Sequence, residues 1–357
     1  MIRWRVGTVT AIDEVGPGRL RLLVATADGE LPAIAYPDIT GAPAIGARVL
    51  LNATALHQEL GTGGVAIVAA RLDAGDSDRD GPGHIVKVRY TPSQVTVASV
   101  DEQFSPHHRV MADADDLDGL PVVGADLHSS LPAVVAGVHQ AAPDARIGYV
   151  MTDGAALPAA LSETVAGLRE AGALGVTITS GQSFGGDLEA VTVHTALLAA
   201  RLVARVDVAV IGQGPGNLGT GTRWGFSGVA AGEAVNAASV LGGRPVAVLR
   251  ISGADERPRH RGLSHHSLTA LGRVALRPAD VVVPMLRGDL ESLGADVLDA
   301  ARSLSPPHRL VEVDIDGLLP ALEASPVRLS TMGRSLDEDP AAFLAAAAAG
   351  RHAASLL

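Results

Sequence analysis

The 357-residue chain has no cysteine and a single lysine, Lys87, and aromatic residues make up only 3% of it. Without cysteine the chain cannot form disulfide bonds or thiolate zinc sites, and it cannot use a cysteine nucleophile. Hydrophobic residues are nevertheless 47% of the chain, so alanine, valine, leucine and isoleucine must fill the core. The length is enough for two domains or one large one.

Positive charge is also scarce, and the formal net charge is −11. A protein that follows a nucleic-acid backbone needs basic patches to displace counterions, so we expect no nucleic-acid partner. No apolar run reaches about 18 residues without a polar interruption, which predicts no transmembrane helix. The first five residues lack the apolar stretch of a signal peptide. We therefore expect a cytoplasmic protein that does not bind membranes.

Residues 1–72 predict a small antiparallel β module that resembles a barrel. Short β-rich runs alternate with turn signals such as Gly16-Pro17-Gly18, and no helix is expected before residue 70. Residues 73–118 are expected to form a linker and an extended connection, because residues 73–83 are polar and contain glycine and proline. The runs expected to be strands are Val6–Ile12, Leu20–Thr26, Arg48–Asn52 and Gly64–Arg71.

Residues 119–357 predict an α/β domain with the binding site. Apolar runs alternate with helical segments, which is typical of a doubly wound, mostly parallel sheet with helices on both faces. Asp339 fits the N-cap and Pro340 the first position of the last helix. Residues 188–204 predict a helix that is apolar nearly all round. The expected strands are Leu120–Ala125, Arg146–Met151, Gly175–Thr179, Val206–Ile211, Pro245–Ile251, Val281–Val283 and Arg309–Val313.

Polar and glycine-rich segments follow five of these strands. Ligands of open parallel sheets bind outside the carboxyl ends of the strands, so we expect the segments after residues 125, 151, 179, 211 and 251 to meet in one cleft. Asp126, His128 and His265 are the expected catalytic residues. Asp126 and His128 are two apart, a spacing that points side chains the same way from a strand, and histidine titrates near neutrality. The alternative is structural: Asp126 would cap the next helix and His128 would bond locally.

The glycine loop, residues 212–228, is the richest single segment. Three of its glycines have the dinucleotide-binding spacing after a strand, so backbone N–H groups could approach a phosphate closely. Pro215 removes one donor, and a purely structural turn accounts for the loop equally well. Nearby arginines could grip a carboxylate or phosphate with both amino groups. The residues expected to bind the ligand are Ser180, Gln182, Gly214, Gly216, Gly219, Thr220, Arg259 and Arg261.

A divalent metal is a second interpretation of the same region. Carboxylate oxygens and imidazole nitrogens suit such ions. The chain has no complete metal-binding signature such as HExxH, so the cofactor stays open. The expected ligands, if a metal is present, are Asp126, His128, Asp187 and His266.

Five further segments carry a family signal: Leu60–Gly64, Gly83–Pro92, Thr179–Gln182, Gly219–Thr222 and Arg259–His266. Together they resemble an uncharacterised bacterial protein family that is catalogued as a domain of unknown function. The resemblance spans most of the chain, from the β module to about residue 285. It implies no established activity and no catalytic residues.

Three functions follow from these observations. The one we favour is an enzyme that acts on a small anionic metabolite, phosphorylated or nucleotide-like, at the carboxyl ends of the strands. The alternatives are a metal-dependent hydrolase and a non-catalytic protein that binds a ligand or takes part in assembly. The apolar helix expected at residues 188–204 would lie in the core or in the interface of a homodimer.

Overall fold

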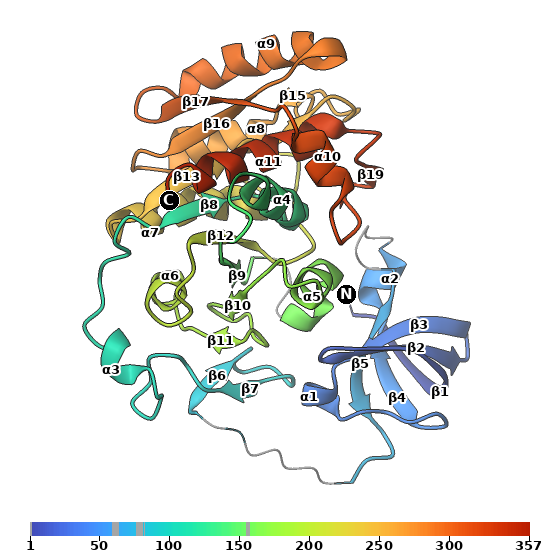
Figure 1. Cartoon of the computed structure of the whole chain (residues 1–357). Helices are drawn as coiled ribbons and strands as arrows, with labels where there is room; N and C mark the ends of the chain where they lie inside the picture. The colour runs from blue at the N-terminus through green and yellow to red at the C-terminus, as the bar shows by residue number, and fades with distance from the viewer. Residues whose placement is uncertain (1, 59–63, 76–80, 82, 155–157) are drawn as a thin grey trace.

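The computed structural model describes residues 2–58, 64–75, 81, 83–154 and 158–357 of the chain. It contains a closed five-stranded barrel and an eight-stranded parallel sheet with helices. Figure 1 shows the N-terminal barrel in blue beside the green part of the sheet, with the orange and red C-terminal elements at the far end. The predicted fold, an α/β domain preceded by a small β barrel, is confirmed.

The barrel closes through pairing of its first strand with its fourth. The side chains of Leu22, Val24 and Leu51 point inward and are almost fully buried. One pair, β3 with β5, is parallel, so the purely antiparallel expectation is wrong. Two one-turn helices, α1 (Pro37–Thr40) and α2 (Thr54–His57), also contradict the expectation of no helix before residue 70. The strands are β1 (Trp4–Gly16), β2 (Arg19–Thr26), β3 (Gly29–Ala35), β4 (Arg48–Asn52) and β5 (Ala66–Arg71).

A small hairpin, β6 (Ile85–Lys87) with β7 (Val95–Val97), and the short α3 (His108–Met111) connect the barrel to the sheet. Lys87, the only lysine, is buried, and its Nζ donates to the carbonyl oxygens of Thr179 and Ser183 at 3.2 and 2.6 Å. Its ion pair with Glu189 is 2.7 Å long. The hairpin is therefore fastened to the edge of the sheet. Residues 76–80 and 82 of the predicted linker lie outside the described residues.

The strands of the large sheet are all parallel, in the order β11-β10-β9-β12-β8-β13-β16-β17. All seven predicted strands are present. The eighth, β11, begins the segment 188–204, so the helix predicted there starts only at residue 193. The strands are β8 (Pro121–Gly124), β9 (Ile147–Thr152), β10 (Val176–Thr179), β11 (Leu188–Glu189), β12 (Val208–Gln213), β13 (Arg244–Val248), β16 (Asp280–Met285) and β17 (Arg309–Asp314).

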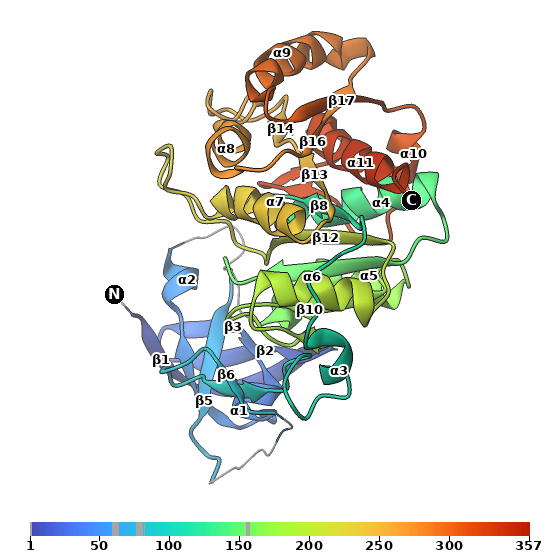
Figure 2. The same ribbon diagram turned by 90° about the vertical axis from the view of Figure 1, so that its left-hand side faces the viewer.

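Helices cover both faces of this sheet. Neighbouring residues of β8 belong to different core clusters: Val122 packs with residues of α6 and Val123 with residues of α4 and α11. Figure 2 shows α7 and α8 on one side of the strands and α4 and α11 on the other. The helices are α4 (Leu131–Ala141), α5 (Glu163–Glu170), α6 (Val193–Leu202), α7 (Ala230–Val240), α8 (His265–Thr269), α9 (Glu291–Ala301), α10 (Leu318–Glu323) and α11 (Pro340–Ala354).

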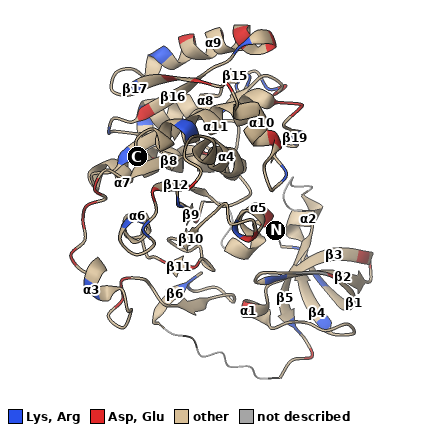
Figure 3. Cartoon of the chain, viewed as in Figure 1, with Lys and Arg blue, Asp and Glu red and all other residues tan. Residues whose placement is uncertain are grey.

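Short elements join these helices and strands. They are η1 (His128–Ser130), η2 (Ala159–Leu161), η3 (Ser227–Val229), η4 (Ala270–Val274), η5 (Gly288–Leu290) and η6 (Arg302–Leu304), and the hairpins of β14 (Ile251–Ser252) with β15 (Gly262–Leu263) and of β18 (Ser330–Thr331) with β19 (Arg334–Ser335). Among the described residues, no helix is both long and apolar enough to cross a membrane. Figure 3 shows Lys and Arg spread over the barrel, helices and loops rather than gathered on one element.

The strand order places a crossing point between β8 and β12. From β8 the chain passes through α4 to β9, on the far side of β12. From β12 it passes through α7 to β13, on the far side of β8. Two adjacent strands thus lead to helices on opposite faces, and such a switch point leaves a crevice at their carboxyl ends.

Candidate functional site

Three buried polar side chains meet at the crossing of β8 and β12. Asp126 follows β8, Thr152 ends β9 and Gln213 ends β12, and their exposed fractions are 7%, 9% and 2%. They line one small hollow with the start of α7. Within the part of the chain that the structure describes, Asp126 Oδ2, Thr152 Oγ1 and Gln213 Oε1 have no hydrogen-bond partner. Such atoms cost free energy in the folded state unless a ligand or water pairs with them.

Local contacts hold the three residues in place. The amide Nε2 of Gln213 donates to the carbonyl oxygen of Asp126 at 2.7 Å, which ties the ends of β12 and β8 together. Gly228 packs against the same residue, because a Cβ added there would lie only 2.9 Å from Asp126 Cβ. Of the five segments expected to meet in one cleft, those after residues 125, 151 and 211 line this hollow, whereas those after residues 179 and 251 do not.

Arg250 lies beside this hollow, two residues after β13, and is 8% exposed. Its Nη1 donates to Nδ1 of His266 at 2.9 Å, and the same nitrogen is 3.6 Å from Asp126 Oδ2. Its Nε and Nη2 make no hydrogen bond to the described residues. The side chain also lines a second hollow. Arg250 therefore keeps donors available for an anion.

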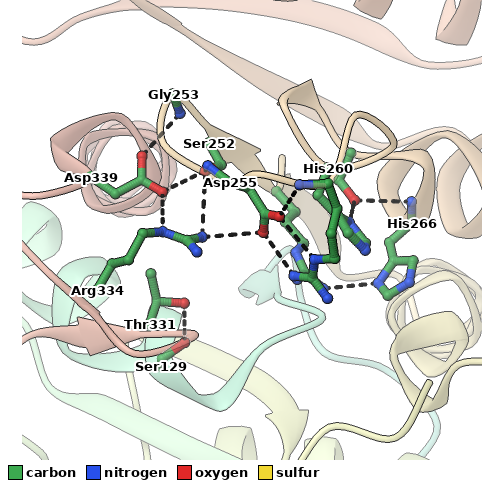
Figure 4. Close-up of polar contacts among 12 residues, drawn as sticks. Ser129, Ser252, Gly253, Asp255, His260, His266, Thr331, Arg334 and Asp339 are labelled. Atoms are coloured by element: carbon green, nitrogen blue, oxygen red, sulfur yellow. Dashed lines mark hydrogen bonds and ion pairs between the residues drawn. The ribbon is translucent and has the colours of Figure 1, made fainter. Parts of the chain in front are cut away.

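An ion-pair network borders the second hollow (Figure 4). Arg334 Nε donates to Asp339 at 3.0 Å, and Arg334 Nη2 is 3.3 Å from Asp255. Hydrogen bonds from Arg257 hold the pKa of the Asp255 carboxyl well below its usual range. Arg334 thus joins the two carboxylates, and Ser252 Oγ donates to Asp339 and accepts from the backbone N–H of Asp255. In this network the charges of Arg334, Asp255 and Asp339 compensate one another.

The hairpin of β18 and β19 lies over the same hollow. Oγ of Ser129, at the start of the helical segment after β8, is 2.9 Å from Oγ1 of Thr331. Ser130 and Met332 also line the hollow. The hairpin is therefore bonded to the end of β8, and a ligand at Arg250 would be enclosed by the hairpin and the N-terminus of η1.

His260, His265 and His266 form a cluster against Phe226. The ring of Phe226 stacks on His266 with centroids 3.6 Å apart. Burial, and then the charge of Arg250, lowers the pKa of His260 to about 3. Burial also lowers the pKa of His265, with a smaller contribution from His266. Because Arg250 donates to Nδ1 of His266, that nitrogen carries a lone pair and its Nε2 carries the proton.

Among the described residues, these three histidines are the one group of three or more acidic or histidine side chains placed to hold a metal, with ligand atoms within 4.8 Å of one another. The chemistry of the group does not favour a cation. The lone pair of His266 is taken by Arg250, and Nδ1 of His260 is bonded to Ser264 Oγ at 2.8 Å. Arg250 is also one of the positive charges that disfavour protonation of His260, and the same charges would repel a metal ion.

His128 does not join Asp126 in a metal or acid–base pair. Its Nδ1 is 3.0 Å from the hydroxyl of Tyr149 and its Nε2 is 2.7 Å from Ser162 Oγ. Burial lowers its pKa to about 4. With both nitrogens bonded, the ring links η1 to β9 and to the start of α5. The spacing argument fails here because Asp126 and His128 lie on a turn into η1 and not on an extended strand.

Asp187, Ser180 and Gln182 also lie away from Asp126. Asp187 accepts hydrogen bonds from the backbone of Thr177 at 2.7 Å and from Arg169 at 3.0 Å, so it is no part of a metal group with Asp126 and His266. Ser180 is buried against β9. The backbone N–H of Gln182 donates to a carboxylate oxygen of Asp153 at 2.9 Å. These contacts join the loop after β10 to the segment after β9, and Lys87 joins the same loop to the hairpin of β6 and β7.

The glycine loop folds on itself. Thr220 donates through its backbone to Gly225 at 2.7 Å, and its Oγ1 is 3.0 Å from Oγ1 of Thr222. Gly216 has a φ of 94°, a conformation that glycine adopts without strain. Gly214 is buried and Gly219 is exposed. The loop is therefore a compact turn, and its phosphate-binding role stays a prediction.

The two exposed arginines of the predicted site have different surroundings. The guanidinium of Arg259 lies over Gly221, 3.5 Å from the position that a Cβ would take there. Arg261 is exposed at the start of the β14–β15 hairpin's second strand. Arg250, by contrast, is buried and lines the second hollow. It is the better anion ligand because water competes less with a buried guanidinium.

Sequence reasoning left four of these residues out of the expected site. Thr152 and Gln213 each end a strand, and that position alone was a usable signal. Arg250 stood in the arginine-rich segment after β13, but only the fold shows which of those arginines is buried. Nothing in the sequence pointed to Arg334, because apolar residues show no regular spacing in the segment around it.

One family matches nearly the whole chain. It is described as a protein of unknown function (DUF3866), and the match covers residues 32–350. The matched range includes every residue of the site, from Lys87 to Asp339. No curated protein and no solved structure matches the chain.

Proposed function

The chain belongs to DUF3866, a family of unknown function, and we propose from the geometry at its strand ends that it is an enzyme acting on a small anionic metabolite. The observation that carries the proposal is Arg250, a buried guanidinium that lines the second hollow and has one amino group bonded to His266. The nearest carboxylate oxygen, Asp126 Oδ2, is 3.6 Å from Arg250 Nη1 and accepts no hydrogen bond from it, and an anionic ligand would complete the pairing of this buried charge.

The two proton-transfer groups lie together at Nη1 of this arginine, with Asp126 Oδ2 3.6 Å from His266 Nδ1. Asp126 Oδ2 is 3.6 Å from Arg250 Nη1, and His266 Nδ1 is 2.9 Å from the same nitrogen. Asp126 can accept a proton from a bound ligand, and Nε2 of His266 can donate one. Stacking on Phe226 fixes the ring of His266. An anion on Arg250 would therefore be bound with a base and an acid close by, which is the requirement for proton-transfer chemistry.

The anion site is tested by titrating inorganic phosphate and acetate and measuring binding by calorimetry. Arg250→Lys keeps the charge but loses the planar fork, and we expect it to weaken the binding of at least one of the two anions about tenfold or more. Arg302→Gln is the matched control, because Arg302 is an exposed arginine on η6 and should not affect binding. Equal anion binding by the wild type and Arg250→Lys would refute the proposal.

Turnover separates an enzyme from a binding protein. The protein is incubated with mixtures of small phosphorylated and carboxylated metabolites, and the products are followed by mass spectrometry. We expect a substrate to be consumed by the wild type and not by Asp126→Asn. Activity that disappears after treatment with a chelator would favour the metal-dependent hydrolase instead. Anion binding without turnover of any compound would leave a non-catalytic ligand-binding protein.

A further inference from the structure

The small hollow between β8 and β12 has a chemistry of its own. We propose that it binds a primary ammonium group, and that the ligand of this protein is therefore a small zwitterion whose anionic group lies on Arg250. The inference rests on the proposed function for its anionic end. It adds the second end of the ligand and so names the substrate class: amino acids or their phosphonic analogues.

The three unpaired atoms of the hollow are all hydrogen-bond acceptors. Gln213 Oε1 and the ionised carboxylate oxygen Asp126 Oδ2 can only accept hydrogen bonds. Thr152 Oγ1 can also accept them, through its lone pairs. One amide N–H of Gln213 donates a hydrogen bond to the carbonyl oxygen of Asp126, and this bond fixes the orientation of Gln213 Oε1. Each of the three side chains is more than nine-tenths buried. The hollow therefore requires a ligand group that donates.

The number of acceptors and the size of the hollow indicate which donor fits. The hollow has room for about one water-sized group, so a ring or a phosphate does not enter it. A hydroxyl group donates only one hydrogen bond and carries no charge to match the Asp126 carboxylate. A primary ammonium group occupies one heavy-atom position and donates three hydrogen bonds. Its charge also matches the carboxylate of Asp126 and strengthens those bonds.

The position of Arg250 distinguishes a zwitterion from a free cation. Its Nη1 is 3.6 Å from Asp126 Oδ2, so a metal ion or a simple amine at that oxygen would meet an uncompensated positive charge. A molecule with an anionic group next to its ammonium would bring its own counter-charge to Arg250. Asp126 lines the small hollow and Arg250 lines the second one, and the contact of 3.6 Å between Asp126 Oδ2 and Arg250 Nη1 would set the ammonium and anionic groups of the ligand side by side.

The test uses four small probes in calorimetric titrations of the full chain. L-Alanine carries both groups, L-lactate replaces the ammonium with a hydroxyl, propionate has neither donor, and 1-aminoethylphosphonate carries a phosphonate in place of the carboxylate. We expect alanine or the aminophosphonate to bind at least about tenfold more tightly than lactate and propionate, because a site built for donors rejects ligands that lack them. The tighter of the two amines identifies the anionic group.

Two valine variants provide the matched comparison. Thr152→Val removes one acceptor of the hollow, whereas Thr177→Val removes an equally buried and unpartnered hydroxyl on β10 that does not line it. We expect the first to weaken amine binding several-fold and the second to have no effect. Binding of all four probes with equal affinity, or of none, would overturn the ammonium site. If phosphate or acetate still binds in a way that depends on Arg250, the anion site of the proposed function stands although the ammonium site has failed.

Discussion

His128 shows how a residue with the chemistry of a catalyst can serve the fold. The ring bonds to Tyr149 and Ser162, and neutral imidazole satisfies both contacts if Nδ1 donates to the tyrosine oxygen and the serine hydroxyl donates to Nε2. A second proton would have to displace the serine hydroxyl from Nε2. Burial, which lowers the pKa of His128 to about 4, acts in the same direction.

This predicts a loss of stability in mild acid. An unfolded histidine binds its proton near pH 6.5, whereas folded His128 does so near pH 4, so between these values the unfolded state holds more protons. The free energy of unfolding should fall as the pH drops from about 6.5 towards 4, with a slope of at most about 1.4 kcal/mol per pH unit for this group. The contribution is complete above pH 6.5.

The measurement is urea unfolding at pH 7 and pH 5. His128→Gln keeps hydrogen-bonding capacity but cannot titrate, so the variant should be less stable at pH 7 and should lose less stability on acidification than the wild type. His260, whose pKa is lowered to about 3, contributes a similar loss and is present in both proteins. The carboxylates with lowered pKa values, such as Asp280, act only below about pH 4. Identical pH dependence in both proteins would contradict the assignment.

The positions of the site residues could be predicted from the sequence, but whether their polar atoms are hydrogen-bonded could not. The rule that ligands bind at the carboxyl ends of parallel strands selected the segments that contain Asp126, Thr152 and Gln213. Whether a polar atom is paired depends on neighbours that are distant in the sequence, and no local pattern reports it. Asp339 is an example: it precedes α11 as an N-cap should, yet its side chain caps nothing and accepts from Ser252 and the backbone of Gly253.

At the scale of elements, α4 and α11 are packed unusually closely. A Cβ added to Gly137 would lie 1.9 Å from the carbonyl oxygen of Ala347, and one added to Gly350 would lie 2.1 Å from that of Val134. Both glycines therefore allow the backbones of the two helices to touch. This explains how a helix made largely of alanine, α11, buries nearly all of its side chains.

Gly137→Ala should consequently destabilise the protein, although alanine favours helices by about 1 kcal/mol over glycine. The added methyl group meets backbone atoms, which cannot rotate away, so we expect a net loss of about 1–3 kcal/mol and a lower melting temperature. Gly75→Ala is the control, since a Cβ there meets no atom within 4 Å. An unchanged melting temperature of Gly137→Ala would show that the helices separate easily.

The elements themselves were largely predictable. Most strands of the parallel sheet are buried on both faces and are therefore mainly apolar, which is why all seven predicted runs correspond to strands. The two-residue strands, such as β11 and β18, contain too few residues for any period to appear. The order of the strands was not predictable, because the insertion of β12 between β8 and β9 is decided by long-range packing.

At the scale of the whole molecule, the barrel is joined to the α/β part by contacts as well as by the chain. Arg19 on β2 is only 5% exposed and reaches across to η2 and α5. Its Nη1 donates to the carbonyl oxygen of Leu161 at 3.3 Å, and its Nη2 is 3.4 Å from a carboxylate oxygen of Glu163. A buried arginine bonded in this way orients the barrel relative to the sheet.

Arg19→Met should weaken this junction while leaving the barrel interior intact. Methionine retains most of the apolar stem but loses the hydrogen bond and the ion pair, and bonds of this kind to charged groups contribute about 1.5–3 kcal/mol. We expect a lower free energy of unfolding and faster hydrogen exchange of α5 backbone amides, because α5 and η2 lose the contact with β2. Arg48→Met is the control, since Arg48 on β4 is exposed. Unaltered exchange in α5 together with a full loss of stability would place the effect inside the barrel and contradict the junction.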